Sequence, residues 1–281
     1  MRLSVITDEI SPDLEQALAV CAELGVRTVE LRSVEGKNVV LHDDSTHRRL
    51  SRVIADRGFR VCAIASPFLK CPAPGDTRRF DTAAGASPGT AREQWPVLER
   101  SWQVARLYQA PLVRAFSYWR LDRPDAATEV LVEELGRAAA ATAGEGLTLG
   151  LENEHECNLA TGAEAAAVLA RVPAATLGVI WDPGNEARLG STPFPDGYAH
   201  VRGRVVHVHV KDLDREQRWV APGRGTIDFT GQLRALAEDG YGGALSIETH
   251  YSAAGGDSAA ATRECVQALR RLSVEAGAGL D

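Results

Sequence analysis

The sequence lacks an apolar run long enough to cross a membrane, and it contains very little lysine. A membrane-spanning helix needs about 20 consecutive, mostly apolar residues, and no such run occurs in the 281 residues. The chain begins at Met1 and enters an apolar segment directly, without the architecture of a signal peptide. Lysine occurs only three times, so arginine carries nearly all of the basic charge. These absences argue against a membrane protein and predict a cytoplasmic location.

An excess of positive charge is also absent. Lys and Arg number 31 and Asp and Glu number 38, which gives a net charge of −7. Proteins that bind nucleic acids draw their affinity from clustered Lys and Arg, so no nucleic-acid partner is expected. The five cysteines are odd in number and follow no metal-ligand spacing, as is typical of free thiols in a reducing compartment.

Short β-like runs alternate with longer helical segments along the whole chain. The first unit shows the signals, because Ser11 is a suitable helix N-cap, Pro12 suits the first helical position and Gly25 ends the helix. The predicted strands are residues 3–6, 27–31, 59–65, 111–115, 147–152, 176–181, 204–209 and 244–248. The predicted helices are residues 12–24, 45–57, 88–109, 124–143, 162–171, 195–202, 229–239 and 257–275.

Alternating βα units predict a parallel sheet covered by helices. Eight such units of about 35 residues match the (β/α)8 TIM barrel in number and length, formed by residues 1–281 as a single domain. An open doubly wound sheet is the alternative, but no glycine-rich dinucleotide-binding turn follows the first strand. The irregular stretches 66–90 and 212–227 are predicted to be loops over the face where the active sites of such barrels lie.

Carboxylate and imidazole side chains end five of the predicted strands. They are Glu30, Glu152, Asp182, the pair His207 and His209, and Glu248. Because the carboxyl ends of barrel strands meet at the mouth, these groups converge, and closely packed carboxylates repel one another unless a cation lies between them. Two Glu, one Asp and one imidazole suit Mn²⁺, Mg²⁺, Co²⁺ or Zn²⁺. The alternative is that each group caps a loop or pairs with an arginine.

Four segments of the chain resemble the xylose isomerase-like superfamily of sugar isomerases and epimerases. They are Trp181-Asp182-Pro183-Gly184-Asn185, His207-Val208-His209-Val210-Lys211-Asp212, Pro222-Gly223-Arg224-Gly225-Thr226-Ile227-Asp228-Phe229 and Ser246-Ile247-Glu248-Thr249-His250. The resemblance covers nearly the whole chain. It implies one divalent metal ion, Mn²⁺ first of all, held by Glu152, Asp182, His209 and Glu248. From the 3-epimerases of the superfamily, it also implies that Glu152 and Glu248 act as base and acid.

Four further residues are candidates for substrate binding. Lys211 lies on the same side of its strand as His209, where it could bind a substrate oxygen or pair with a carboxylate. By the resemblance, Arg215 follows in the loop where epimerases place a substrate-binding arginine. Asn185 and His155 are the other two, whereas His207 lies deeper in its strand and is expected to be a core residue or a partner of the metal ligands.

Two residues depart from the 3-epimerase pattern. Asn185 replaces a histidine and Asn158 replaces a glutamate, and both changes remove charge near the substrate. The third and fourth strands end near Ser66 and Arg114, without the extra histidines of a trinuclear phosphodiesterase site, which argues against DNA repair. For a phosphate group on the substrate, only the turn from Pro222 to Gly225 is a candidate cradle.

Three functions follow from these observations. The first is a metal-dependent isomerase or epimerase of a small sugar or polyhydroxy carbonyl compound, acting through an enediolate. The second is a lyase that begins with the same proton abstraction, either an inosose-type dehydratase or an enzyme eliminating from a 3-keto-glycoside. The third is a catalytically silent barrel that binds a partner. A small carbohydrate is the expected partner, and assembly into a homo-oligomer is left open.

Overall fold

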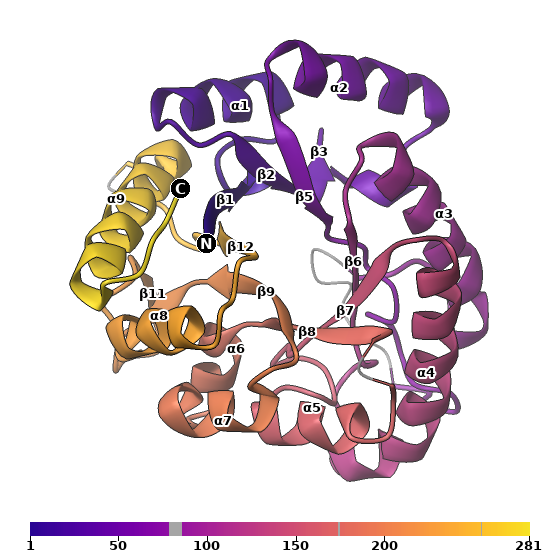
Figure 1. Ribbon diagram of the computed structural model, residues 1–281. Coiled ribbons are helices and arrows are strands. Elements are labelled where there is room, and N and C mark those ends of the chain that lie inside the picture. The colour runs from indigo at the N-terminus through magenta and orange to yellow at the C-terminus, as the bar shows by residue number, and fades with distance from the viewer. Residues whose placement is uncertain (79–85, 174, 254) are drawn as a thin grey trace.

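Eight parallel strands close into one barrel, and the helices pack around its outside (Figure 1). The computed structural model describes residues 1–78, 86–173, 175–253 and 255–281. In their order around the barrel, the strands are β1 (Arg2–Ile6), β2 (Thr28–Leu31), β5 (Arg60–Ile64), β6 (Leu112–Ala115), β7 (Thr148–Glu152), β8 (Leu177–Trp181), β9 (Val205–Val210) and β12 (Ala244–Ile247). Pairing of β12 with β1 closes the barrel. The predicted single-domain (β/α)8 barrel is confirmed.

Helices follow the strands, and the longer ones bury one face against the barrel. The helices are α1 (Leu14–Glu23), α2 (Asp44–Asp56), α3 (Gln94–Leu107), α4 (Thr128–Gly144), α5 (Gly162–Leu169), α6 (Pro183–Arg188), α7 (Tyr198–Val201), α8 (Phe229–Glu238) and α9 (Ser258–Ala276). In α1 the buried residues are Leu14, Ala17, Leu18 and Cys21. This spacing of three and four residues produces the apolar stripe that holds a helix on the sheet.

The first helix begins later than the sequence predicts. Its N-cap is Asp13, whose Oδ1 accepts hydrogen bonds from the backbone N–H groups of Glu15 and Gln16 at 2.8 and 3.2 Å. The Oγ of Ser11 instead accepts from the N–H of Asp13 at 3.1 Å, one step before the helix. The prediction of Ser11 as N-cap is therefore wrong, because the carboxylate of Asp13 takes the helix N–H groups.

A short helix, α6, follows β8 where the sequence predicts none. Asp182 caps it by accepting from the N–H of Asn185 at 2.9 Å, and Pro183 occupies its first position. The predicted helix 195–202 is in fact the π turn η5 (Pro193–Gly197) followed by α7. The predicted helix 88–109 begins with the 3-10 turn η3 (Ala91–Glu93) and continues as α3.

Two small hairpins project from loops at the carboxyl ends of the strands, and neither was predicted. They are β3 (Ser33–Val34) with β4 (Lys37–Asn38), and β10 (Asp212–Leu213) with β11 (Trp219–Val220). The remaining 3-10 turns are η1 (Thr7–Glu9), η2 (Val39–Leu41) and η4 (Pro124–Ala127). Of the predicted loop 66–90, residues 79–85 lie outside the described residues.

Within the described ranges, no helix is long and apolar enough to span a membrane. All five cysteines are free and buried, as expected for thiols inside apolar segments. The cytoplasmic location stays a prediction of the sequence.

Candidate metal centre

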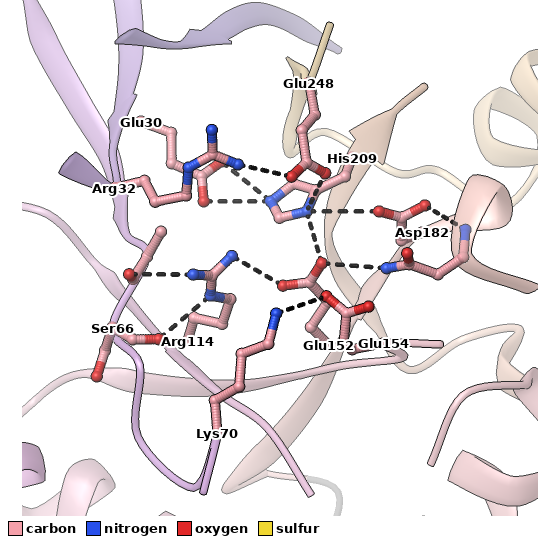
Figure 2. A network of polar contacts seen from close by, with 12 residues as sticks. Glu30, Arg32, Ser66, Lys70, Arg114, Glu152, Glu154, Asp182, His209 and Glu248 are labelled. Carbon is pink, nitrogen blue, oxygen red and sulfur yellow. Dashed lines mark hydrogen bonds and ion pairs between the residues drawn. The ribbon is translucent and has the colours of Figure 1, made fainter. Parts of the chain in front are cut away.

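Four of the predicted residues meet at the mouth of the barrel. Glu152 is the last residue of β7, Asp182 follows β8, His209 lies in β9 and Glu248 follows β12. All four are buried, and one ligand atom from each lies within 4.8 Å of the others. From Nδ1 of His209, the carboxylate oxygens of Glu152, Glu248 and Asp182 lie at 3.2, 3.6 and 3.8 Å (Figure 2). The expected ligand quartet is thus brought together.

The donor set fits a dication. Oδ2 of Asp182 is buried and makes an ion-pair contact with Nζ of Lys211 at 2.9 Å that lacks the geometry of a hydrogen bond. Burial raises the pKa of Asp182 to about 6, and the charges of Glu248 and Glu152 also raise it. A carboxylate in such surroundings gains stability from a nearby positive charge. Three carboxylates and an imidazole nitrogen are the donors of hard to borderline divalent ions.

Lys211 provides positive charge beside the quartet. Its Nζ lies 2.9 Å from Oδ2 of Asp182 and 2.8 Å from Oε2 of Glu248. Burial alone would raise the pKa of Glu248, but Lys211 and neighbouring cations hold it well below its usual range. A Cβ at Gly184 would lie 2.5 Å from the Lys211 side chain, so the close approach of α6 to Lys211 depends on this glycine. Of the two roles predicted for Lys211, the structure contains the ion pair.

Arg114 holds one oxygen of Glu152. Its Nη1 donates to Oε2 of Glu152 at 2.9 Å, and its other nitrogens donate to the carbonyls of Ser66 and Ala65, both at 3.2 Å. Burial would raise the pKa of Glu152, but the charges of His209 and Arg114 keep it below the ordinary value. No role in the site was expected for Arg114, although an arginine inside an apolar strand is itself a signal of a buried ion pair.

Arg32 holds Glu248 in the same manner. Its Nη1 lies 2.8 Å from Oε1 of Glu248, and its remaining nitrogens contact the carboxylates of Asp8 and Glu9 at 2.9 and 2.5 Å. His250 lies 3.2 Å from the same oxygen of Glu248. Both glutamates therefore present one oxygen to an arginine and the other to the quartet.

Glu30 lies beneath the quartet in the barrel interior. One of its oxygens is 2.8 Å from Nε2 of His207, and both are 3.2 Å from Nε2 of His209. Because side chains two apart on a strand share one face, both imidazoles of β9 reach this carboxylate. Burial would raise the pKa of Glu30, but the two imidazoles hold it well below the usual range. His207 is thus a buried partner of the site, as expected.

His155 and Asn185 form a second polar layer beside the quartet. Nδ1 of His155 lies 2.8 Å from Oδ1 of Asn185 and 2.7 Å from Oε1 of Glu154. Asn185 extends its Nδ2 to Oε1 of Glu152 at 3.4 Å. Lys70 Nζ lies 3.2 Å from Oε2 of Glu154. Sequence reasoning missed Lys70, because nothing near it in the chain reveals a partner 84 residues away.

A cavity of about 500 Å³ opens above the quartet. Its walls are formed by Asp8, Arg32, Ser33, Lys70, Arg114, Phe116, Glu154, His155, Glu156, Arg188, Trp219, Glu248 and His250. Of the four predicted substrate-binding residues, only His155 is among the described residues that line this cavity. Lys211 and Asn185 lie buried at the quartet, and Arg215 is exposed in the turn between β10 and β11. Asn158 is buried and donates to the carbonyls of Ser117 and Trp119.

The fold and this site together define a class, the (β/α)8 barrels with a candidate divalent-metal centre at the carboxyl ends of their strands. The chain belongs to the xylose isomerase-like TIM barrel family, whose family model matches residues 18–272. No curated protein matches the chain.

Solved structures of similar fold include sugar epimerases and a dehydratase. One is a xylose isomerase-like TIM barrel/4-hydroxyphenylpyruvate dioxygenase fusion protein, which is 21% identical with a TM-score of 0.76. The match covers 98% of this chain but only 43% of the fusion protein. An L-ribulose 3-epimerase is 21% identical with a TM-score of 0.73, over 98% of this chain and 97% of its own. The probable 3-DHS dehydratase AsbF from Bacillus anthracis is 14% identical with a TM-score of 0.74, and the match covers 96% of this chain and 99% of AsbF. At these identities the likeness shows the fold.

Proposed function

We propose that this protein is a divalent-metal-dependent isomerase or epimerase of a small polyhydroxy carbonyl compound, acting through an enediolate intermediate. The observation that carries the proposal is the convergence of Glu152, Asp182, His209 and Glu248 on one buried point. An ion held there, Mn²⁺ by preference, would polarise the substrate carbonyl and acidify the neighbouring C–H bond. The likeness to an L-ribulose 3-epimerase supports a small carbohydrate as the substrate class.

Glu152 and Glu248 are the residues proposed to move the proton. They extend from β7 and β12 on either side of His209 (Figure 2). An epimerase needs a base on one face of the substrate carbon and an acid on the other. Arg114 and Arg32 each hold one carboxylate oxygen, at 2.9 and 2.8 Å, which fixes the direction of the other oxygen.

Lys211, Asn185 and His155 are proposed to contact the substrate's oxygens beside the quartet. Lys211 and Asn185 lie within hydrogen-bonding reach of the ligand carboxylates, and His155 lines the cavity. Arg215 is proposed to contact the substrate from the turn above the mouth, although its side chain lies exposed.

A lyase is the second candidate, and His155 favours it. Burial lowers the pKa of His155, but its hydrogen bond to Glu154 and the charge of that carboxylate raise it more, so the pKa lies above its ordinary value. An imidazole with a raised pKa keeps its proton to higher pH, so His155 in the cavity wall is suited to protonate a leaving hydroxyl group. Elimination would begin with the same proton abstraction as isomerisation.

Deuterium exchange tests both candidates. Protein stripped with a chelator and then reloaded with Mn²⁺ is incubated in D₂O with ketoses, inososes and 3-keto-glucosides. Mass spectrometry or NMR detects the exchange. We expect deuterium at the carbon next to the carbonyl only after the protein has been reloaded with Mn²⁺. Exchange without loss of water or aglycone supports the isomerase, and elimination supports the lyase. Exchange that survives chelation, or none with any compound, would contradict the proposal.

The Glu30→Gln variant is expected to weaken Mn²⁺ binding by about 10- to 100-fold. The carboxylate of Glu30 accepts from Nε2 of His209, which leaves Nδ1 directed at the other ligands. A glutamine offers one neutral oxygen and an amide group that repels the ring N–H. Calorimetry with Mn²⁺ measures the change. Glu186→Gln is the control, since Glu186 is also buried but accepts from the N–H of Gly162 away from the quartet; equal affinities of the two variants would refute the role of Glu30.

A further inference from the structure

One cation in the cavity wall has no carboxylate partner. Arg32, Lys70 and Arg114 each pair with Asp or Glu side chains at 2.5 to 3.3 Å. Arg188, at the end of α6, lines the same cavity and forms no ion pair with any residue in the described ranges. A guanidinium carries five N–H donors, so most of those of Arg188 remain available for a ligand.

Arg188 is nevertheless held in place. Its Nη1 donates to the backbone carbonyl of Gln217 at 2.5 Å. Its guanidinium carbon lies 5.7 Å from the centre of the Trp219 ring, in the range of a cation–π contact. Because these contacts orient the guanidinium beforehand, a ligand that binds it loses less conformational freedom in the complex.

Trp219 connects Arg188 to the metal centre. The ring centre of Trp219 lies 5.4 Å from Nζ of Lys211, which itself contacts Asp182 and Glu248. The ammonium of Lys211 and the guanidinium of Arg188 are therefore no more than about 11 Å apart. A small molecule whose carbonyl end lies at the quartet can reach Arg188 with its other end.

The turn that could have cradled a phosphate is already filled from within the chain. The carboxylate of Asp212 accepts from the backbone N–H groups of Gly223, Gly225 and Ile227 at 2.9, 3.0 and 3.3 Å. A Cβ at Gly225 would lie 2.2 Å from Oδ1 of Asp212, so the carboxylate fits tightly into the turn. Phosphate sites in these barrels are commonly built in the loops after strands seven and eight, and in the turn after β9 these N–H groups are occupied.

We infer that the substrate of this site carries a carboxylate, and that Arg188 binds it. The inference rests on the proposed function for the reacting end of the molecule. The planar fork of one arginine makes two parallel hydrogen bonds to a carboxylate or to a phosphate, and the filled turn withholds the backbone N–H groups that would bind the further oxygen of a phosphate.

Three sugars that differ only at C6 test the inference: D-fructose, D-fructuronate and D-fructose 6-phosphate. Binding to the Mn²⁺-loaded protein is measured by calorimetry, and exchange at C3 is measured separately in D₂O. We expect D-fructuronate to bind about 10- to 100-fold more tightly than D-fructose, because a charge-assisted hydrogen bond contributes a binding free energy of that size. Arg188→Gln should abolish this difference without changing the weaker binding of D-fructose, and Arg188→Lys should restore part of it.

Arg218→Gln is the matched control. Arg218 lies on the same hairpin as Gln217 and is exposed like Arg188, but it pairs with Asp214 and Glu216. D-fructuronate binding that is unaffected by Arg188→Gln, or no tighter than that of D-fructose, would overturn the inference. Tighter binding of D-fructose 6-phosphate would overturn it in favour of a phosphate. If D-fructuronate binds through Arg188 but no sugar exchanges deuterium, the carboxylate site stands and the proposed function fails.

Discussion

Asp182→Asn is expected to lower the exchange activity at least about 10³-fold while leaving the fold intact. Oδ2 of Asp182 is a buried oxygen at the point where the quartet converges, and it lies 3.8 Å from Nδ1 of His209. Asparagine replaces an anionic ligand by a neutral one and can direct an N–H group at the cation. The other oxygen, which caps α6 through the N–H of Asn185, is retained in the amide.

The same substitution should not destabilise the protein. Burial and the charges of Glu248 and Glu152 raise the pKa of Asp182 to about 6, so its ionised form is disfavoured where it lies. Removing that charge relieves repulsion from the other two carboxylates, and the loss of one Lys211 contact offsets it. Without metal, the free energy of unfolding should change by no more than about 1 kcal/mol.

Two measurements separate these effects. Urea unfolding of the chelator-treated protein gives the stability, and exchange in D₂O with saturating Mn²⁺ gives the activity. Asp228→Asn is the matched control, because Asp228 also caps a helix, accepting from the N–H of Gly231 at 2.8 Å away from the quartet. If Asp182→Asn kept its activity, or lost activity only in proportion to its stability, Asp182 would have a structural role alone.

The fold and the meeting of strand-end carboxylates and imidazoles at one mouth could be predicted from local patterns, and the resemblance to a known family then selected four of these groups as candidate ligands. Each strand and helix has its own apolar period and end signals, and eight such units close in one known way. Parallel strands bring their carboxyl ends together whatever the loops do. Residues as distant as Glu152 and Glu248 are therefore placed at one mouth by topology alone.

The surroundings of the quartet could not be predicted from local patterns. Arg32 contacts Glu248 across 216 positions and Arg114 contacts Glu152 across 38, and neither partner is marked in the sequence near the other. The helix α6 was missed because six residues are too few to show a helical period. It matters for the site, since it ties Asp182 at its start to Arg188 at its end.

These surroundings balance the charge of the quartet. Arg32, Arg114 and Lys211 each place a cation within 3 Å of a ligand carboxylate. Mutual repulsion of three buried carboxylates would otherwise oppose folding. A dication entering the site would compete most directly with Lys211, because its two partner oxygens, on Asp182 and Glu248, both face the quartet.

Lys211→Met is expected to destabilise the metal-free protein by about 3–5 kcal/mol at pH 8, where Asp182 is ionised. The substitution keeps an unbranched side chain that is one heavy atom shorter, but it leaves Asp182 and Glu248 buried without the ammonium that lies 2.9 and 2.8 Å from them. Lys37→Met is the control, because Lys37 is exposed and should change the free energy of unfolding by less than about 0.5 kcal/mol.

Mn²⁺ should reverse much of this loss, because a dication bound between Asp182 and Glu248 replaces the missing charge. The variant should then bind Mn²⁺ more tightly than the wild type does, since no ammonium competes for those two carboxylates. By linkage, saturating Mn²⁺ raises the stability of the variant more than that of the wild type. Urea unfolding with and without Mn²⁺ measures both quantities in one experiment. A variant that is destabilised but gains nothing from Mn²⁺ would mean that Lys211 supports the packing of the mouth and not the charge of a metal centre.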